Sequence, residues 1–195
     1  MSPPPRTLPP LVVTDPAEVS RLCARWITDV LGCTIVDFGI GNRFIGSIDV
    51  LAVSHDVVHL VTVDTGSFAD ALLGAFTGYW WFVENRAFLD RIYGSEDTPL
   101  MGDVVLVILS RDPPRGIQRI LPSLLKVKLR LFRYATMGTA EEPFLCVEEL
   151  TLDEDSGGET HEAGDVEALV RELGIEEAGL DGDEIRRLIA ALRAA

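Results

Sequence analysis

The chain has few of the residues that most often mark a function class. Its 195 residues include three cysteines and three histidines, with no Cys-x-x-Cys pair and no metal-ligand spacing of Cys and His. Cys23, Cys33 and Cys146 are odd in number and lie among apolar residues, which favours reduced thiols in a cytoplasmic protein. The chain also lacks the Gly-x-Gly-x-x-Gly and Gly-x-x-x-x-Gly-Lys-Ser/Thr motifs. Dinucleotide and P-loop chemistry are therefore not indicated.

Long apolar runs are missing as well. No stretch approaches the roughly 20 apolar residues that cross a bilayer. The first ten residues are rich in proline and contain no apolar segment of the kind found in a secretory signal. We therefore expect a cytoplasmic chain with no membrane partner.

Basic residues are scarce at one end of the chain, and this decides how the net charge of −14 is interpreted. Residues 1–140 carry 14 acidic and 13 basic side chains, a net of −1, whereas residues 141–195 carry 17 acidic and 4 basic, a net of −13. The acidic tail disfavours nucleic-acid binding by the whole chain. The nearly neutral body leaves such binding open for the core.

Apolar periodicity and turn residues predict an α/β core between two less regular ends. We expect a flexible arm over 1–14, a core over 15–150, an acidic linker over 151–164 and short helices over 165–195. Within the core, helical periodicity begins at a capping box at Asp15 and ends at Gly32. Further elements are expected in this order: a strand over 34–40, two strands within 43–66, a helix over 68–93, a buried strand over 104–109, a short helix ending at 125, and strands over 126–134 and 144–150.

The helix expected over 68–93 holds much of the aromatic content of the chain. Trp80, Trp81 and Phe88 are candidate interface residues, and one interpretation is a homodimer through this helix or through an edge strand. The alternative is that these aromatic residues pack on the sheet. In that interpretation the helix turns four charged side chains to water: Glu84, Arg86, Asp90 and Arg91.

The strand expected over 126–134 alternates basic and apolar side chains. Lys126, Lys128 and Arg130 share one face, and such a stripe is able to contact the phosphates of a nucleic acid. Basic residues are also an ordinary protection of a strand near the edge of a sheet. Both interpretations stay open from the sequence.

The stretch Arg43 to Gly66 holds the residue that most needs an explanation. It predicts two apolar strands joined by a turn at Ser54, His55 and Asp56, and Asp49 lies in the middle of the first. A carboxylate in an apolar strand has to be paired, bound to metal or neutralised. The simplest partner would be the backbone or Thr62.

Together, Gly46-Ser47-Ile48-Asp49 and the order of elements resemble the core of the PD-(D/E)xK nuclease superfamily, the restriction-endonuclease-like fold, over residues 15 to about 135. The resemblance implies a three-stranded meander followed by alternating helices and strands in one mixed sheet. It also implies a Mg²⁺ or Mn²⁺ site formed by an aspartate of the second strand and a Glu/Asp-x-Lys tripeptide of the third. Asp49 matches that aspartate. The resemblance also implies that Asp64 and Glu18, on the first helix, are candidate metal ligands, with Asp49 and Asp64 as the catalytic pair.

The third strand departs from the family pattern. It reads Val61-Thr62-Val63-Asp64-Thr65-Gly66, so either Asp64 or Gly66 stands where the family has lysine, depending on the register. The candidate replacements for this lysine are Lys126, Lys128 and Arg43. The departure favours a catalytically inactive protein that acts as an interaction or regulatory module. The alternatives are a divalent-metal-dependent nuclease and a nucleic-acid binder that does not cleave.

Overall fold

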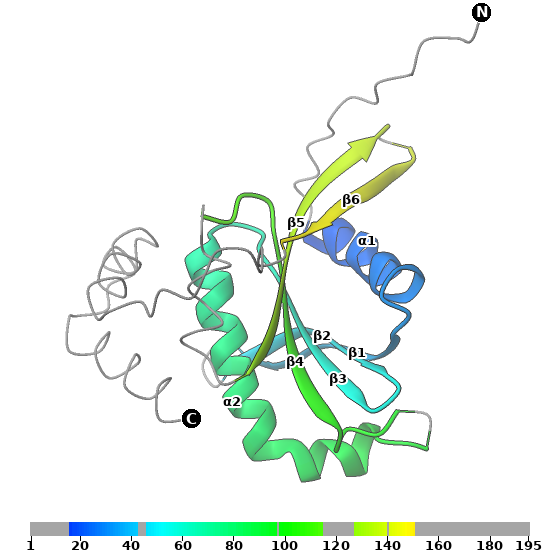
Figure 1. Ribbon diagram of the computed structural model, residues 1–195, viewed down its shortest axis with the longest axis vertical. Helices are drawn as coiled ribbons and strands as arrows, with labels where there is room; N and C mark the ends of the chain where they lie inside the picture. Colours follow the sequence, from blue (N-terminus) through cyan, green and yellow to red (C-terminus); the bar gives the residue numbers. More distant parts are fainter. Residues whose placement is uncertain (1–15, 43–45, 97, 115–126, 140, 151–195) are drawn as a thin grey trace, which may run out of the picture.

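The protein is an α/β structure in which one mixed six-stranded sheet lies between two helices (Figure 1). The computed structural model describes residues 16–42, 46–96, 98–114, 127–139 and 141–150. The described elements are, in chain order, α1 (Pro16–Asp29), β1 (Thr34–Asn42), β2 (Gly46–Ser54), β3 (Val57–Val63), α2 (Phe68–Tyr93), β4 (Asp103–Ser110), β5 (Lys128–Gly138) and β6 (Pro143–Glu149).

The strands follow one another across the sheet in the order of the sequence, β1 to β6. β1, β2 and β3 form an antiparallel meander, β3, β4 and β5 run parallel, and β6 returns antiparallel to β5. The meander follows from the short connections, since a turn at His55 and Asp56 leaves no room for a crossover. Because α2 carries the chain back along the sheet, β4 starts at the same end of the sheet as β3 and pairs with β3 in parallel.

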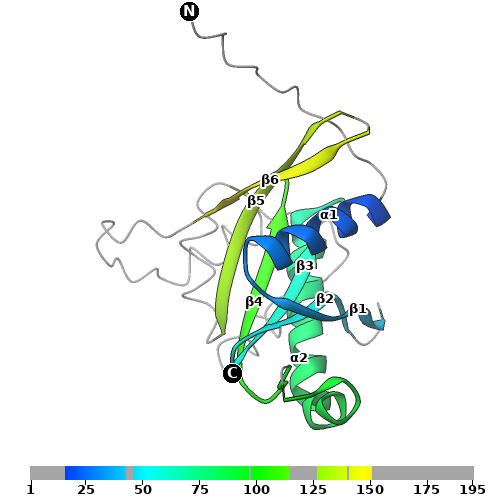
Figure 2. The same cartoon turned by 90° about the vertical axis from the view of Figure 1, so that its right-hand side faces the viewer.

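Each face of the sheet has its own apolar core. α2 covers Leu60, Leu106, Ile108 and Leu131, whereas α1 covers Val61, Val107, Leu109 and Phe132. Figure 2 shows the two helices on opposite sides of the sheet. The central strands therefore read as continuous apolar runs, because both of their faces are buried.

The helix α2 changes direction toward its C-terminal end, where its last turns lie beneath the sheet in Figure 1. Two side chains donate to carbonyls of the preceding turn: Thr77 to Leu73 at 3.0 Å and Asn85 to Trp81 at 2.8 Å. Such side-chain bonds compete with the helical ladder and favour bending. The bend lets α2 wrap the α2-side core rather than lie along one strand.

The structure confirms the single mixed sheet, the antiparallel meander and the long helix over 68–93. Several predictions lie outside the described residues: the proline-rich arm, the cap at Asp15, the short helix ending at 125, Lys126, and the linker and helices after residue 150. In the part of the chain that the structure describes, no helix is both long and apolar enough to cross a membrane.

Candidate functional site

Asp49 lies where the ladder between β2 and β3 opens. The paired residues run from Ser54–Val57 to Val50–Val61, and Asp49 is the next residue of β2. Its Oδ2 atom accepts the backbone N–H of Val63 at 2.7 Å. The carboxylate thus supplies the acceptor that a neighbouring strand carbonyl would otherwise provide, and the N–H at the end of β3 stays satisfied.

The strand β2 loses its regular alternation at the same residue. Ile48 packs in the α2-side core and Val50 in the α1-side core, although residues two apart on a regular strand share a face. Gly39 of β1 lies opposite Asp49, between the pairs Phe38–Val50 and Ile40–Ile48. Its φ of 60° is left-handed, a conformation that favours glycine. Both strands therefore depart from regular strand geometry beside Asp49.

Burial raises the pKa values of two groups in this region, Asp49 and Cys23. Loss of solvent raises the pKa of Asp49, and the hydrogen bond from Val63 offsets this only in part. On the inner side of α1, burial and the nearby Asp49 carboxylate raise the pKa of Cys23 to about 12. Cys23 is therefore a neutral thiol and a core residue, without the thiolate character that a reactive cysteine requires.

Asp64 belongs to a different cluster, at the carboxyl ends of the three parallel strands. Its Oδ2 accepts from the Ser110 hydroxyl at 2.6 Å and its Oδ1 from the N–H of Gly66 at 2.9 Å. Its backbone carbonyl accepts from the Tyr134 hydroxyl at 2.7 Å. The guanidinium carbon of Arg111 lies 5.6 Å from the centre of the Tyr134 ring. This carboxyl-end cluster ties β3, β4 and β5 together.

We expect Tyr134→Phe to lower the free energy of unfolding by about 1 kcal/mol, because it removes the buried bond to Asp64 and keeps the ring. Urea denaturation measures the change. Met137→Leu, a change of similar size further along β5 that removes no hydrogen bond, is the control. A Phe variant as stable as the wild type would mean that water replaces the lost hydroxyl.

The two described residues of the expected basic stripe, Lys128 and Arg130, are paired with carboxylates. Lys128 bonds Asp103 at 2.6 Å, and Arg130 makes two bonds to Glu149 at 2.7 and 2.8 Å. Strand pairing places Lys128 beside Val105, and Val105 beside His59. Because His59 precedes Asp64 by five residues of β3, Lys128 lies roughly 16 Å from Asp64 along the strand direction. The basic side chain beside the carboxyl-end cluster is instead Arg111.

The three candidate metal ligands have separate partners. Glu18 bonds Arg21 at 3.0 Å on the surface of α1, Asp49 bonds Val63, and Asp64 bonds Ser110. Among the described residues, no group of three or more His, Cys, Asp or Glu side chains is placed to hold a metal ion. A metal at Asp49 would share a carboxylate that already accepts the Val63 N–H through Oδ2, and it would have to recruit further ligands.

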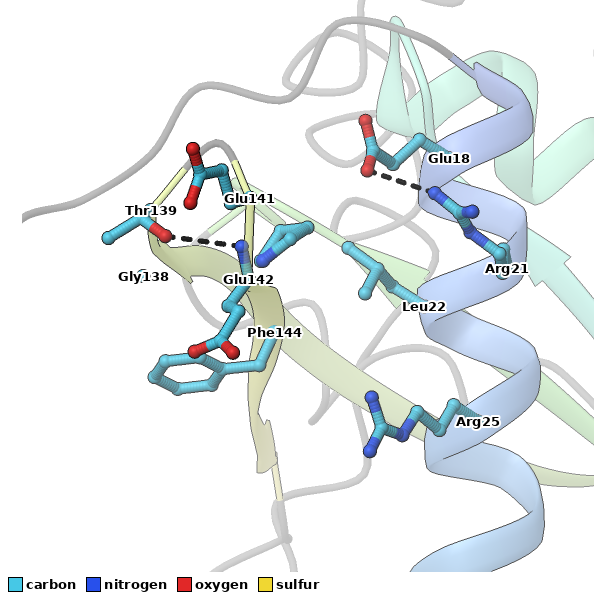
Figure 3. A pocket seen from close by; sticks show the side chains of 10 residues that line it. Glu18, Arg21, Leu22, Arg25, Gly138, Thr139, Glu141, Glu142 and Phe144 are labelled. Carbon is cyan, nitrogen blue, oxygen red and sulfur yellow. Dashed lines mark hydrogen bonds and ion pairs between the residues drawn. The ribbon is translucent and has the colours of Figure 1, made fainter.

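A groove lies between α1 and the hairpin of β5 and β6, with a volume of about 730 Å³. Figure 3 shows the residues that line it. α1 contributes Glu18, Arg21, Leu22 and Arg25; the hairpin contributes Gly138, Thr139, Glu141, Glu142, Pro143 and Phe144. Leu22 and the half-exposed Phe144 are its large apolar side chains.

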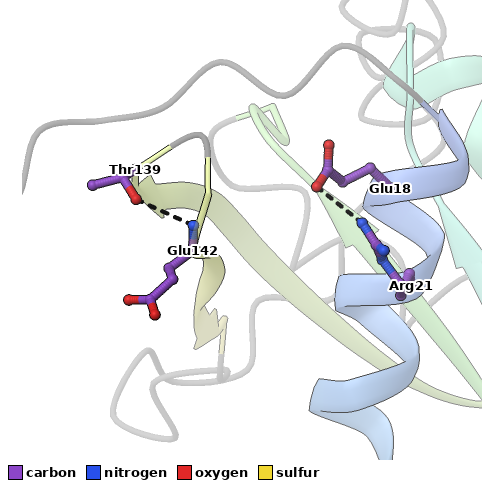
Figure 4. Close-up of polar contacts among 4 residues, drawn as sticks. All are labelled: Glu18, Arg21, Thr139 and Glu142. Carbon is purple, nitrogen blue, oxygen red and sulfur yellow. Dashed lines mark hydrogen bonds and ion pairs between the residues drawn. The ribbon is translucent and has the colours of Figure 1, made fainter.

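Local bonds hold the hairpin wall of this groove. The Thr139 hydroxyl accepts the N–H of Glu142 at 3.1 Å, as Figure 4 shows beside the Glu18–Arg21 pair. Gly138 has a φ of 108°, and a Cβ there would come within 2.4 Å of the Glu142 carbonyl. The tight turn therefore needs glycine at this position.

The aromatic helix divides its candidate interface residues between two environments. Trp80 and Phe88 are exposed, by 38% and 55%, whereas Trp81 packs half-buried against the α2-side core. The prediction that Arg86 and Asp90 face water is wrong. Arg86 donates to the carbonyls of Leu100 and Gly102, and Asp90 accepts the N–H of Leu100 at 2.9 Å.

Sequence reasoning missed Ser110, Arg111 and Tyr134 of the carboxyl-end cluster, and the groove. A signal existed for the cluster, since Ser110 and Arg111 directly follow the buried strand expected over 104–109, whose continuous apolar run is typical of parallel strands. Polar residues after such strands meet at the carboxyl end of a sheet, where ligands bind in open α/β folds.

Comparisons of this chain with protein-family models, with curated proteins and with solved structures found no match.

Proposed function

We propose that this protein is a cytoplasmic interaction module on a restriction-endonuclease-like core, without hydrolytic activity of its own. The observation that carries the proposal is the use of both strand carboxylates inside the protein. Asp49 accepts from the backbone of β3, and Asp64 accepts from Ser110 and Gly66. The helix, meander, helix and parallel strand in this order support the core.

The groove between α1 and the β5–β6 hairpin is the interaction surface that we assign. On its α1 wall, Arg21 pairs with Glu18 at 3.0 Å and Arg25 with Asp29 at 3.8 Å. Within the described residues, Glu141 and Glu142 have no cationic partner. The unbalanced charge of the groove is therefore negative, which repels the phosphates of a nucleic acid.

The chemistry of the groove favours a peptide segment of a partner protein that carries basic residues around one apolar anchor. The anchor would contact Leu22 and Phe144, and the basic side chains would approach Glu141 and Glu142. A few anchoring residues, most often aromatic side chains and arginine, dominate the energy of an interface. The inactive core then serves as the rigid support of the groove.

The catalytic alternative is tested by titrating the full chain with Mn²⁺ in a calorimeter and by assaying cleavage of plasmid DNA and of RNA. We expect no saturable heat and no cleavage above that of an Asp49→Asn variant, which keeps an acceptor for Val63. Metal-dependent cleavage that disappears in Asp49→Asn would show a nuclease and refute the proposal.

The groove is tested by selecting a phage-displayed random peptide library on the immobilised full chain. We expect enriched peptides with Lys or Arg beside an apolar residue, which bind the wild type and lose at least roughly tenfold in affinity to Phe144→Asp. Phe38→Asp, at an exposed phenylalanine on the opposite edge strand, is the matched control and should bind normally. Enriched peptides indifferent to Phe144 would exclude the groove.

A further inference from the structure

The outer face of α2 exposes apolar side chains that no other described element covers. Val83 is 41% exposed, and Phe88 and Ile92 are each 55% exposed, while Phe82 and Leu89 on the inner face are buried. Trp80 adds a further exposed aromatic ring one turn earlier. Apolar side chains gathered on one helical face in this way mark an interaction surface more often than isolated ones do.

Two charged residues interrupt this face, Glu84 and Arg91. Both are exposed, and neither has an ion-pair partner within the described residues. A helix usually pairs opposite charges three or four positions apart. The residues at those distances from Glu84 and from Arg91 carry no opposite charge. Their charges are therefore available to another molecule.

We propose that the outer face of α2 binds the same face of a second copy of this chain, with the two helices antiparallel about a two-fold axis between Ala87 and Phe88. An isologous contact of this kind sets each residue against its mirror position along the helix. Ala87 then faces Phe88 of the second copy, Glu84 faces Arg91, and Val83 faces Ile92. Apolar residues meet apolar residues, and each acid meets a base.

The shape of α2 limits this contact to a few turns. The helix bends around the sheet, so its outer face is convex and two copies touch mainly near the axis (Figures 1 and 2). Ala87 is small and permits close approach there. The long side chains of Glu84 and Arg91 extend across the gap that widens on either side. The interface is accordingly small, and association is at the weak end of protein–protein contacts.

α2 lies on the opposite side of the sheet from α1, which forms one wall of the groove (Figure 2). A dimer through α2 is therefore separate from the binding site of the proposed function. A dimer through α2 leaves both grooves open and directed outward. A partner that carries two binding segments would therefore gain affinity through bivalent attachment. The two proposals also fail independently, since one depends on Phe144 and the other on Phe88.

Sedimentation velocity of the full chain over a series of micromolar concentrations tests the pairing. We expect a reversible dimer that Phe88→Glu weakens by roughly 100-fold, since the change acts twice in a two-fold contact. Arg91→Glu and Glu84→Arg should each weaken it by roughly tenfold. The double variant Glu84→Arg/Arg91→Glu should restore the wild-type dissociation constant, because it only exchanges the two charges.

The controls separate the interface from net charge and from folding. Arg25→Glu changes the net charge as Arg91→Glu does, on α1 at the far side of the sheet, and should leave the dimer intact. Circular dichroism at a protein concentration too low for dimers should give the same spectrum and closely similar melting behaviour for all variants, since association no longer contributes to stability there. A wild type that stays monomeric, a dimer indifferent to Phe88→Glu, or a double variant as weak as the single ones would each overturn the proposal.

Discussion

Replacement of Phe82 by alanine should lower the free energy of unfolding by about 3–5 kcal/mol, the largest loss that we expect from one side chain of α2. Phe82 is fully buried in the α2-side core and belongs to its largest buried side chains. Its removal takes away the transfer free energy of the ring and leaves a cavity that the surrounding strands fill only in part. Urea denaturation followed by circular dichroism measures the loss.

Phe88→Ala is the matched control, since it deletes the same side chain from the outer face of the same helix. Phe88 is 55% exposed, so its truncation should change the stability of the monomer by about 0.5 kcal/mol or less. Both variants are compared at a protein concentration too low for dimers, because association stabilises the folded state by mass action. Equal losses in the two variants would contradict the assignment of an inner and an outer face to α2.

Phe82 and Phe88 show what hydrophobic periodicity can predict for this helix and what it cannot. The pattern of residues 68–93 predicts a helix with an apolar inner face, and the structure confirms the element from Phe68 to Tyr93. The pattern does not decide which aromatic residues remain outside, because α2 is apolar over much of its circumference. Trp81 packs on the core and Trp80 does not, and the difference depends on how the bent helix meets the sheet.

The sequence also predicts much of the strand arrangement. Short turns predict the meander, and the continuous apolar run over 104–109 predicts a buried strand of the kind found in parallel sheets. The sequence does not predict the hydrogen-bond partners of single polar side chains, since Ser110 and Tyr134 contact Asp64 across 46 and 70 residues of sequence. Those contacts require the register of β3, β4 and β5, which apolar residues on both faces leave undefined.

The same limit applies to Arg86 and Asp90. Helical spacing turns both toward solvent, and an exposed ion pair would have been an ordinary outcome. Their partners are backbone groups of the connection between α2 and β4, at Leu100 and Gly102. A loop that packs back on a helix supplies polar partners without any periodic signal. The bend of α2 is what brings the start of this connection under the sheet (Figure 1).

The proposed lack of catalysis and the proposed dimer rest on one property of the fold, the use of polar groups to complete backbone bonding. Asp49, Asp64 and Asp90 each accept a backbone N–H. Glu84 and Arg91 have no such role, and Glu141 and Glu142 lie at the groove without cationic partners among the described residues. Charges without a structural role are the ones left for recognition, and here they lie on two opposite faces.

Substitution of Asp49 separates its structural role from a catalytic one. Asp49→Asn keeps an oxygen that accepts from Val63, whereas Asp49→Ala leaves that N–H without a partner near the end of β3. We expect the Ala variant to be less stable than the Asn variant by about 1–3 kcal/mol, the cost of a buried unpaired donor. Urea denaturation of both variants at neutral pH measures this difference.

The pH dependence of the same variants gives the sign of the charge effect. Because burial raises the pKa of Asp49 in the folded state, its proton is held more tightly there than in the unfolded chain. The wild type therefore has its full contribution from Asp49 below the unfolded pKa, and loses part of it as the pH rises through the folded pKa. Asp49→Asn cannot ionise, so its stability relative to the wild type should increase between about pH 4 and pH 7. A relative stability that falls over this range would mean that the ionised carboxylate is stabilised by a cation, and the metal interpretation of Asp49 would then be favoured over the structural one.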